Sequence, residues 1–156
     1  MELVETTGER RSDELIAQLT VVWERSVRAT HAFLTEEGIA ELRPVLPQAM
    51  QSVEHLVVAR DGEEEAGKLV GFMGVQNHFL EMLFLDPAVR GQGLGRKLLE
   101  FGFANYGVKE LTVNEQNPGA CAFYEHMGFR IISRSDVDAA GRSYPLLTMR
   151  RIRSDR

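Results

Sequence analysis

The segment VRGQGLGRKLLEFGF (89–103) places three glycines in five positions, just before an apolar pattern with helical spacing. Gly91, Gly93 and Gly95 alternate along it, with basic residues on both sides. Glycine inside a helix costs roughly 0.5–1 kcal/mol relative to alanine, so these three need a reason. A tight strand-to-helix turn is one explanation. A second explanation is an anion-binding site, because a helix N-terminus offers free amides and the positive end of the helix dipole. We favour this explanation and expect the glycines to bind a phosphate.

The spacing of the glycines excludes the two commonest nucleotide loops. A P-loop requires G-x-x-x-x-G-K-[ST], and a dinucleotide fingerprint requires G-x-G-x-x-G. Counted from Gly91, the last glycine of either motif falls on Arg96. The bound phosphate therefore belongs to another class of ligand.

Length and composition predict one soluble domain over residues 1–156. Hydrophobic residues make up 44% and charged residues 26%, which is typical of globular proteins, and no apolar run is long enough to cross a membrane. The start of the chain is acidic and lacks the apolar core of a leader peptide, and Cys121 has no partner for a disulfide. We therefore expect a cytoplasmic protein. A net charge of -5 argues against nucleic-acid binding.

Periodicity divides the chain into alternating strands and helices. Ser12 and Thr35 precede helical apolar patterns, and short β-branched runs follow them. The expected strands are 1–5, 55–60, 68–75, 79–86, 110–115 and two closing strands, and the expected helices follow Ser12 and Thr35 and occupy 93–106 and 117–128. This order predicts an α+β (α/β) fold, a mixed sheet with helices on both faces.

RGQGLG (90–95) resembles the Q/R-x-x-G-x-G/A signature of the GNAT superfamily of acyl-CoA N-acyltransferases. Arg90, Gly93 and Gly95 stand at its three defining positions. The resemblance implies a single GNAT-like domain whose mostly antiparallel sheet has six or seven strands.

Flanking segments extend this resemblance from about residue 68 to residue 129. LFLDP (83–87) looks like the central strand of the family, and NPGACAFYEHMGF (117–129) looks like its downstream Asn, Tyr and Gly-Phe motif. WERSVRATHAFL (23–34) is similar to the N-terminal region of small bacterial YjaB-like members.

By resemblance, the donor is acetyl-CoA, with its pyrophosphate on the backbone amides of residues 91–96. The strand before the turn would pair with the pantetheine arm and polarise the acetyl carbonyl, although its side chains are expected in the core. Asn117 would lie near the same arm, and it also suits the N-cap that precedes Pro118. The expected donor-binding residues are Leu83, Phe84, Leu85, Arg90, Gly91, Gln92, Gly93, Leu94, Gly95, Arg96, Asn117 and Tyr124.

Transfer of an acyl group to an amine poses two proton problems. A lysine-like amine is neutral in only about one molecule in 2,500 at pH 7, a handicap of roughly 4.6 kcal/mol, and the departing thiolate needs an acid. The resemblance places Tyr124 as that acid, although a tyrosine before a helix end is often only packed. Glu81 is a candidate base, because the alternation of side chains along a strand puts it on the same face as Leu83 and Leu85. The alternative is that Glu81 lies in solvent at the end of the strand. His31 is the other candidate, with a capping or surface role as its alternative.

The sequence therefore predicts an N-acetyltransferase that moves the acetyl group of acetyl-CoA to a primary amine by direct attack in a ternary complex. The alternative is a non-catalytic acyl-CoA-binding sensor or scaffold. The expected acceptor is an amine-bearing small molecule, a peptide or a protein lysine. We expect no nucleic-acid partner, no membrane and no metal, and a protein that is a monomer or a homodimer. The segments 30–38 and 136–144, expected on the acceptor side, carry no motif that selects among these amines.

Overall fold

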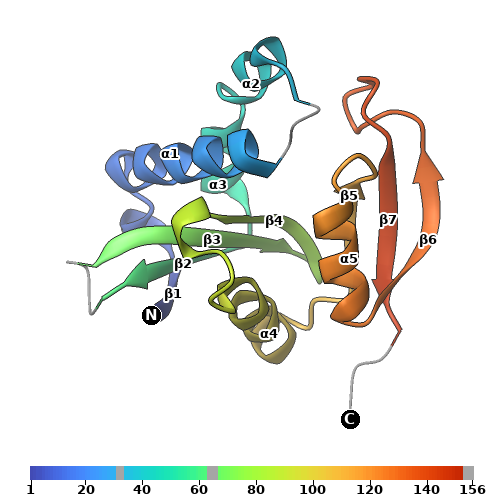
Figure 1. Ribbon diagram of the computed structural model, residues 1–156. Helices are drawn as coiled ribbons and strands as arrows, with labels where there is room; N and C mark the ends of the chain where they lie inside the picture. The colour runs from blue at the N-terminus through green and yellow to red at the C-terminus, as the bar shows by residue number, and fades with distance from the viewer. Residues whose placement is uncertain (31–33, 63–66, 153–156) are drawn as a thin grey trace.

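The computed structural model describes residues 1–30, 34–62 and 67–152 (Figure 1). These residues contain a seven-stranded sheet in the order β1-β2-β3-β4-β5-β7-β6, with every pair antiparallel except β4 and β5. The fold class predicted from the sequence is confirmed. The strands are β1 (Glu2–Thr6), β2 (His55–Asp61), β3 (Lys68–Gln76), β4 (Phe79–Leu85), β5 (Glu110–Asn114), β6 (Phe129–Ser135) and β7 (Leu146–Arg151).

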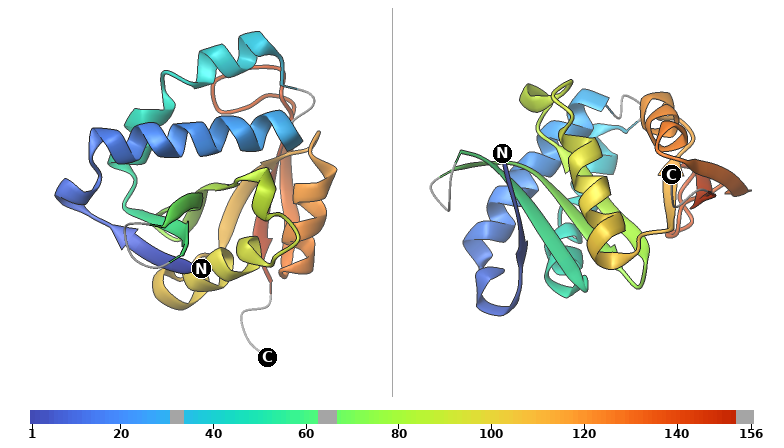
Figure 2. Two further views of the ribbon diagram at one scale, coloured as in Figure 1. Left: turned by 60° about the vertical axis from the view of Figure 1, so that its left-hand side comes forward. Right: turned by 90° about the horizontal axis from the view of Figure 1, so that it is seen from below.

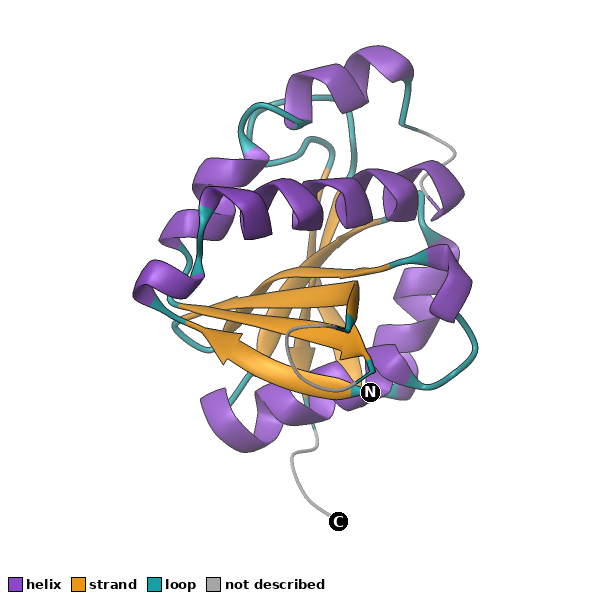
Figure 3. Ribbon diagram, turned by 90° about the vertical axis from the view of Figure 1, so that its left-hand side faces the viewer, coloured by secondary structure: helices purple, strands orange, loops and turns teal. Residues whose placement is uncertain are grey.

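Helices cover both faces of the sheet (Figure 3). One apolar core lies between the sheet and the first three helices, and a second lies between the sheet and the last two. The first three are α1 (Asp13–Thr30), α2 (Glu36–Leu42) and α3 (Leu46–Ser52), and the last two are α4 (Leu94–Tyr106) and α5 (Pro118–His126). Short 3-10 turns, η1 (Gly8–Arg10) and η3 (Pro87–Val89), precede α1 and α4.

Side-chain caps fix the helix starts that the sequence predicted. Ser12 Oγ accepts the amide of Leu15 at 3.1 Å, and Thr35 Oγ1 accepts the amide of Gly38 at 3.0 Å. The helical stretch expected after Thr35, with interruptions at Pro44 and Pro47, is two short helices, α2 and α3. They are separated at residues 43–45, where Pro44 has no N–H to donate.

The sheet is divided where β4 meets β5. Only two register pairs join these parallel strands, Phe79 with Glu110 and Leu80 with Leu111. Beyond them the strands diverge, and β5–β7 form with α5 a wing that turns away from β1–β4 (Figures 1 and 2). Backbone groups in the second half of β4 therefore have a sheet partner in β3 but none in β5.

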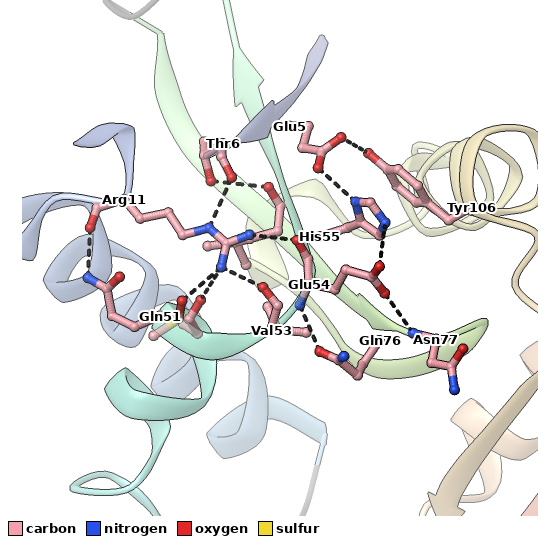
Figure 4. Close-up of polar contacts among 12 residues, drawn as sticks. Glu5, Thr6, Arg11, Gln51, Val53, Glu54, His55, Gln76, Asn77 and Tyr106 are labelled. Carbon is pink, nitrogen blue, oxygen red and sulfur yellow. Dashed lines mark hydrogen bonds and ion pairs between the residues drawn. The ribbon is translucent and has the colours of Figure 1, made fainter. Parts of the chain in front are cut away.

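A polar network ties the N-terminal strand to the rest of the domain (Figure 4). The buried guanidinium of Arg11 donates to five backbone carbonyls, those of Thr6, Met50, Gln51, Val53 and Glu54. Glu5 accepts a hydrogen bond from Tyr106 Oη at 2.6 Å and contacts His55 Nδ1 at 2.8 Å. Strand β1, the connection from α3 to β2 and the end of α4 are thereby held together.

Candidate active site

The glycine turn between η3 and α4 presents a row of free backbone amides. Gly91 and Gly93 adopt the left-handed conformation, with φ of +76° and +79°, which other residues rarely reach without strain. A Cβ built on either would meet no atom within 4 Å, so open space lies above the turn. Within the described ranges, no protein acceptor bonds the amides of residues 91–96. These N–H groups and the helix dipole form a concave site for an anion.

A cavity of about 470 Å³ extends from this turn into the divergence between β4 and β5. Its wall combines β4, the glycine turn, the start of α4 and one face of α5. The donor residues expected from the sequence that line it are Leu83, Phe84, Leu85, Arg90, Gly91, Gly93, Leu94, Gly95, Arg96, Asn117 and Tyr124. Of the expected set, only Gln92 lies outside this wall.

Gly95 occupies the narrow point between α4, β4 and α5. A Cβ here would lie 3.4 Å from Phe123 Cζ and 3.5 Å from Leu85 Cδ1, an ordinary contact distance. Gly95 has no left-handed backbone that requires glycine. A larger side chain at this position would therefore extend toward the space between Leu85 and Phe123, both of which line the cavity.

An ion pair between the exposed Arg25 and the buried Asp86 fixes the junction between β4 and the glycine turn. The Asp86 carboxylate, 3% exposed, accepts Arg25 Nε at 2.9 Å and Nη2 at 3.1 Å, and also the amide of Ala88 at 2.9 Å. The hydrogen bonds from Arg25 hold the pKa of Asp86 below the ordinary aspartate value. Through this pair, α1 sets the position at which the chain leaves β4 and enters the turn.

Tyr124 brings a protonated phenol to the cavity from α5. The residue is 9% exposed, packs edge-on against Phe129 at 6.0 Å, and makes no hydrogen bond to any residue that the structure describes. Burial raises its pKa well above the ordinary tyrosine value, so the hydroxyl keeps its proton at neutral pH. A buried, protonated hydroxyl with no protein acceptor is suited to donate to a ligand.

Asn117 begins the helix that carries Tyr124. Its side-chain Oδ1 accepts a hydrogen bond from the backbone amide of Ala120 at 3.2 Å, and its backbone amide donates to Asn114 O at 3.0 Å. The residue caps α5 as predicted, and it also lines the cavity. The geometry is therefore compatible with both roles expected for this side chain.

Glu81, one of the two candidate bases, does not line the cavity. Glu81 is the extra residue of a β-bulge, because Met82 pairs with Gly74 and Leu80 with Val75. A bulge interrupts the regular alternation of side chains between the two faces of the sheet. The expectation that Glu81, Leu83 and Leu85 share one face through strict alternation therefore does not hold across this bulge. Glu81 is exposed, and partial desolvation raises the pKa of its carboxyl. His31 lies outside the described residues.

Comparison with known proteins assigns the family. A family model described as an acetyltransferase (GNAT) domain matches residues 52–131. The chain belongs to the GNAT acetyltransferase family. It is 39% identical over 132 residues to the peptidyl-lysine N-acetyltransferase YjaB of Salmonella typhimurium, which covers 85% of this chain and 88% of that protein. The enzyme is an N-acetyltransferase, and the relatives do not favour a non-catalytic binding module.

One solved structure supports the same assignment, and a second shares the fold. The solution structure of apo-form YjaB from Escherichia coli superposes with a TM-score of 0.83 at 36% identity, covering 97% of this chain and 99% of that one. A PaiA N-acetyltransferase from Thermoplasma acidophilum in complex with coenzyme A shares the fold, with a TM-score of 0.63 at 22% identity over 96% and 99% of the two chains.

Several cavity residues of this acetyltransferase were not predicted. Ser26 and Thr30 reach the wall from the last turns of α1, and Phe123 reaches it from α5. Neither their residue types nor their spacing carries a chemical signal. The small residues Gly119 and Ala120 also line the wall. For these two residues the sequence offers one hint, the segment NPGA (117–120), whose small side chains leave room for a ligand beside a helix start.

A larger cavity, of about 1050 Å³, lies between α1 and strands β1–β3 of the acetyltransferase. It reaches the Arg25–Asp86 pair from the opposite side, but it contains neither the free amides nor Tyr124. Chemistry, and not volume, therefore distinguishes the candidate active site. Over the described part of the chain, no group of His, Cys, Asp and Glu side chains is arranged to hold a metal ion, and no helix is long and apolar enough to span a bilayer.

Proposed function

We propose that this enzyme transfers the acetyl group of acetyl-CoA to the ε-amine of lysine in a peptide or protein, by direct attack in a ternary complex. The acceptor class is supported by the YjaB relative, a peptidyl-lysine N-acetyltransferase that aligns along most of both chains. The observation that carries the proposal is the convergence of free amides and an unpaired buried phenol on one cavity.

The donor fits the residues that are present. The amides of residues 91–96 would hold the pyrophosphate, since the left-handed Gly91 and Gly93 leave open space above them. Backbone groups of β4 from Met82 to Leu85 have no partner in β5 and would pair with the pantetheine arm. The half-buried side chains of Leu83 and Leu85 pack against the core, which supports the strand where it would meet the ligand.

Acetyl-CoA supplies an activated thioester. The β4 amides would stabilise negative charge that develops on the acetyl oxygen. The Tyr124 hydroxyl would donate a hydrogen bond and then its proton to the departing sulfur, because burial keeps this hydroxyl protonated, and so able to act as a donor, at neutral pH.

The acceptor amine must lose a proton before it attacks. Glu81, whose pKa is raised by desolvation, would accept this proton through water, and His31 is the other candidate. The absence of Glu81 from the cavity wall makes the water necessary in this proposal.

A thiol-release screen tests the proposal. The enzyme is incubated with acetyl-CoA and, separately, a peptide with one internal lysine and a blocked N-terminus, a lysine-free peptide with a free N-terminus, a polyamine and an aminoglycoside. We expect thiol release and addition of one acetyl group to the internal-lysine peptide, seen by mass spectrometry. Release with the small amines alone would show that the lysine assignment is wrong. No release with any amine would overturn the enzymatic proposal itself.

A further inference from the structure

The cavity of about 1050 Å³ between α1 and strands β1–β3 has no part in the proposed reaction. We call it the rear cavity. In Figure 3, α1 runs above these strands. Among the described residues, the rear cavity shares no wall residue with the donor cavity, but its wall includes both members of the Arg25–Asp86 pair. An occupant of the rear cavity would therefore touch the pair that fixes the glycine turn without touching the turn itself.

The rear cavity has an apolar floor and one exposed apolar side chain at its rim. The floor consists of side chains from the helix and from the sheet: Val4, Leu15, Val22, Val58 and Leu69. At the rim, Gln18, Val21 and Arg25 follow one another at helical spacing along α1. Val21 is 59% exposed between these polar neighbours. A ligand with an apolar body would remove Val21 from water at no cost to the core.

Unpaired cations gather at one end of this cavity. Arg25 gives Nε and Nη2 to Asp86, and its Nη1 has no acceptor among the residues that the structure describes. Lys68, which is exposed, lines the same end and makes no hydrogen bond or ion pair with a described residue. Its charge contributes to the lowered pKa of Asp86, so the ammonium lies near that carboxylate. Two cations beside one carboxylate leave a single excess positive charge.

This charge favours a monoanion as the ligand. The two oxygens of a carboxylate match the two open donors, Arg25 Nη1 and the Lys68 ammonium. A phosphate dianion would bring a second negative charge close to Asp86, where like charges repel. The α1 wall extends from Arg25 back to Glu14, eleven residues or about 16 Å at the helical rise, which is room for an unbranched chain of medium length.

We propose that the rear cavity is a regulatory site for an amphipathic monocarboxylate, an unbranched apolar chain that ends in one carboxylate. The side chain of Arg25 is 52% exposed, and a carboxylate bound to its Nη1 holds it in the orientation that pairs with Asp86. Asp86 in turn fixes the entry into the glycine turn, so the bound ligand tightens acetyl-CoA binding. This coupling rests on the proposed donor site, whereas binding of the carboxylate does not.

Octanoate is the probe for the site. Isothermal titration calorimetry should give a dissociation constant of about 1 mM or lower. Acetate carries the charge without the chain, and 1-octanol carries the chain without the charge. Each of these two controls should bind at least about tenfold more weakly than octanoate, because each lacks one of the two interactions.

Paired variants locate the bound octanoate. Lys68→Met keeps the apolar stem and removes the charge, and it should weaken octanoate binding by about tenfold. Lys109→Met is its control, because Lys109 is exposed and lies outside the rear cavity. Val21→Asp should also weaken binding, and its control is Val45→Asp, at a valine that is 56% exposed and outside the cavity. All four positions are exposed, and urea unfolding checks that each variant folds.

The coupling is measured by titrating acetyl-CoA with and without saturating octanoate. We expect octanoate to tighten acetyl-CoA binding about fivefold, at the low end of measured couplings between sites. In Asp86→Asn, octanoate should bind at least as tightly as in the wild type, because a neighbouring negative charge is gone. Acetyl-CoA affinity in that variant should no longer respond to octanoate.

Octanoate binding no tighter than that of acetate and 1-octanol, or equal losses in Lys68→Met and Lys109→Met, would overturn the site. Unchanged acetyl-CoA affinity would overturn its regulatory role, and so would weakened affinity, which indicates competition in the donor cavity. Failure of the proposed function looks different, because the wild-type enzyme would then release no thiol with any amine, whether octanoate is present or not.

Discussion

The glycine turn and the contact between α2 and the β6–β7 connection are built from different parts of the chain. The candidate donor site consists largely of backbone: free amides of residues 91–96, two left-handed glycines and the unpaired edge of β4. The contact between α2 and the β6–β7 connection depends instead on two positions, Gly38 and Tyr144, that only the tertiary fold brings together. A backbone site needs a particular local sequence pattern. A side-chain contact needs only two residues that the fold happens to place together.

The largest expected effect comes from altering the glycine turn. Gly93→Val removes the left-handed conformation and puts a branched side chain into the open space above the turn. Loss of two charge-assisted amide bonds, at about 1.5–3 kcal/mol each, weakens acetyl-CoA binding by 100-fold or more, roughly. Isothermal titration calorimetry with acetyl-CoA measures this.

Gly8→Val is the matched control for backbone strain. Gly8 is also left-handed, with φ of +53° and no atom within 4 Å of its Cβ position, but it lies in η1. Equal losses of affinity in the two variants, or unchanged affinity in Gly93→Val, would mean that the glycine turn does not bind the donor.

Tyr124→Phe separates chemistry from binding within the donor cavity. Removing the proton donor should lower kcat by about 100-fold while the affinity for acetyl-CoA stays near the wild-type value. Tyr106→Phe is the comparison. Burial also raises the pKa of Tyr106, but its hydroxyl donates to Glu5 and lies outside the cavity. The Tyr106 variant should lose stability and keep its kcat, and near-wild-type turnover in Tyr124→Phe would remove this residue from the mechanism.

This contrast between the two regions explains how far the sequence could be interpreted. Spacing alone placed the helix starts at Ser12 and Thr35 and the glycine turn, because caps and turns depend on local residues. The bulge at Glu81 was not predictable, since it arises from pairing with β3 and leaves no mark on an apolar strand.

The contact between α2 and the β6–β7 connection shows the same limit more strongly. Nothing local distinguishes Gly38 from any other helical glycine, and its contact with Tyr144 depends on how two halves of the sheet diverge. Ser26 and Thr30 likewise reach the cavity only because α1 ends beside it.

The smallest effect on activity is expected at the junction that supports the donor turn. Asp86→Asn removes a carboxylate whose pKa is lowered chiefly by hydrogen bonds from Arg25. A lowered folded-state pKa contributes stability above the unfolded value of about 3.9, and that contribution disappears as pH falls through the folded-state pKa. Urea unfolding should therefore show a less stable variant at pH 7 and a difference from wild type that shrinks below about pH 4. A difference that is constant with pH would contradict this role.

The two register pairs between β4 and β5 also make the protein divisible. Strands β1–β4 and strands β5–β7 are each continuous in the chain, and each set keeps its own ladders without the other. A break at residues 107–109 would give two fragments, each with its own sheet and helices. One apolar core holds Leu98 from the first fragment against Leu111 and Met149 from the second, so association would rebuild the cavity between them. The fold thus lends itself to a split enzyme whose activity reports on whether its halves have met.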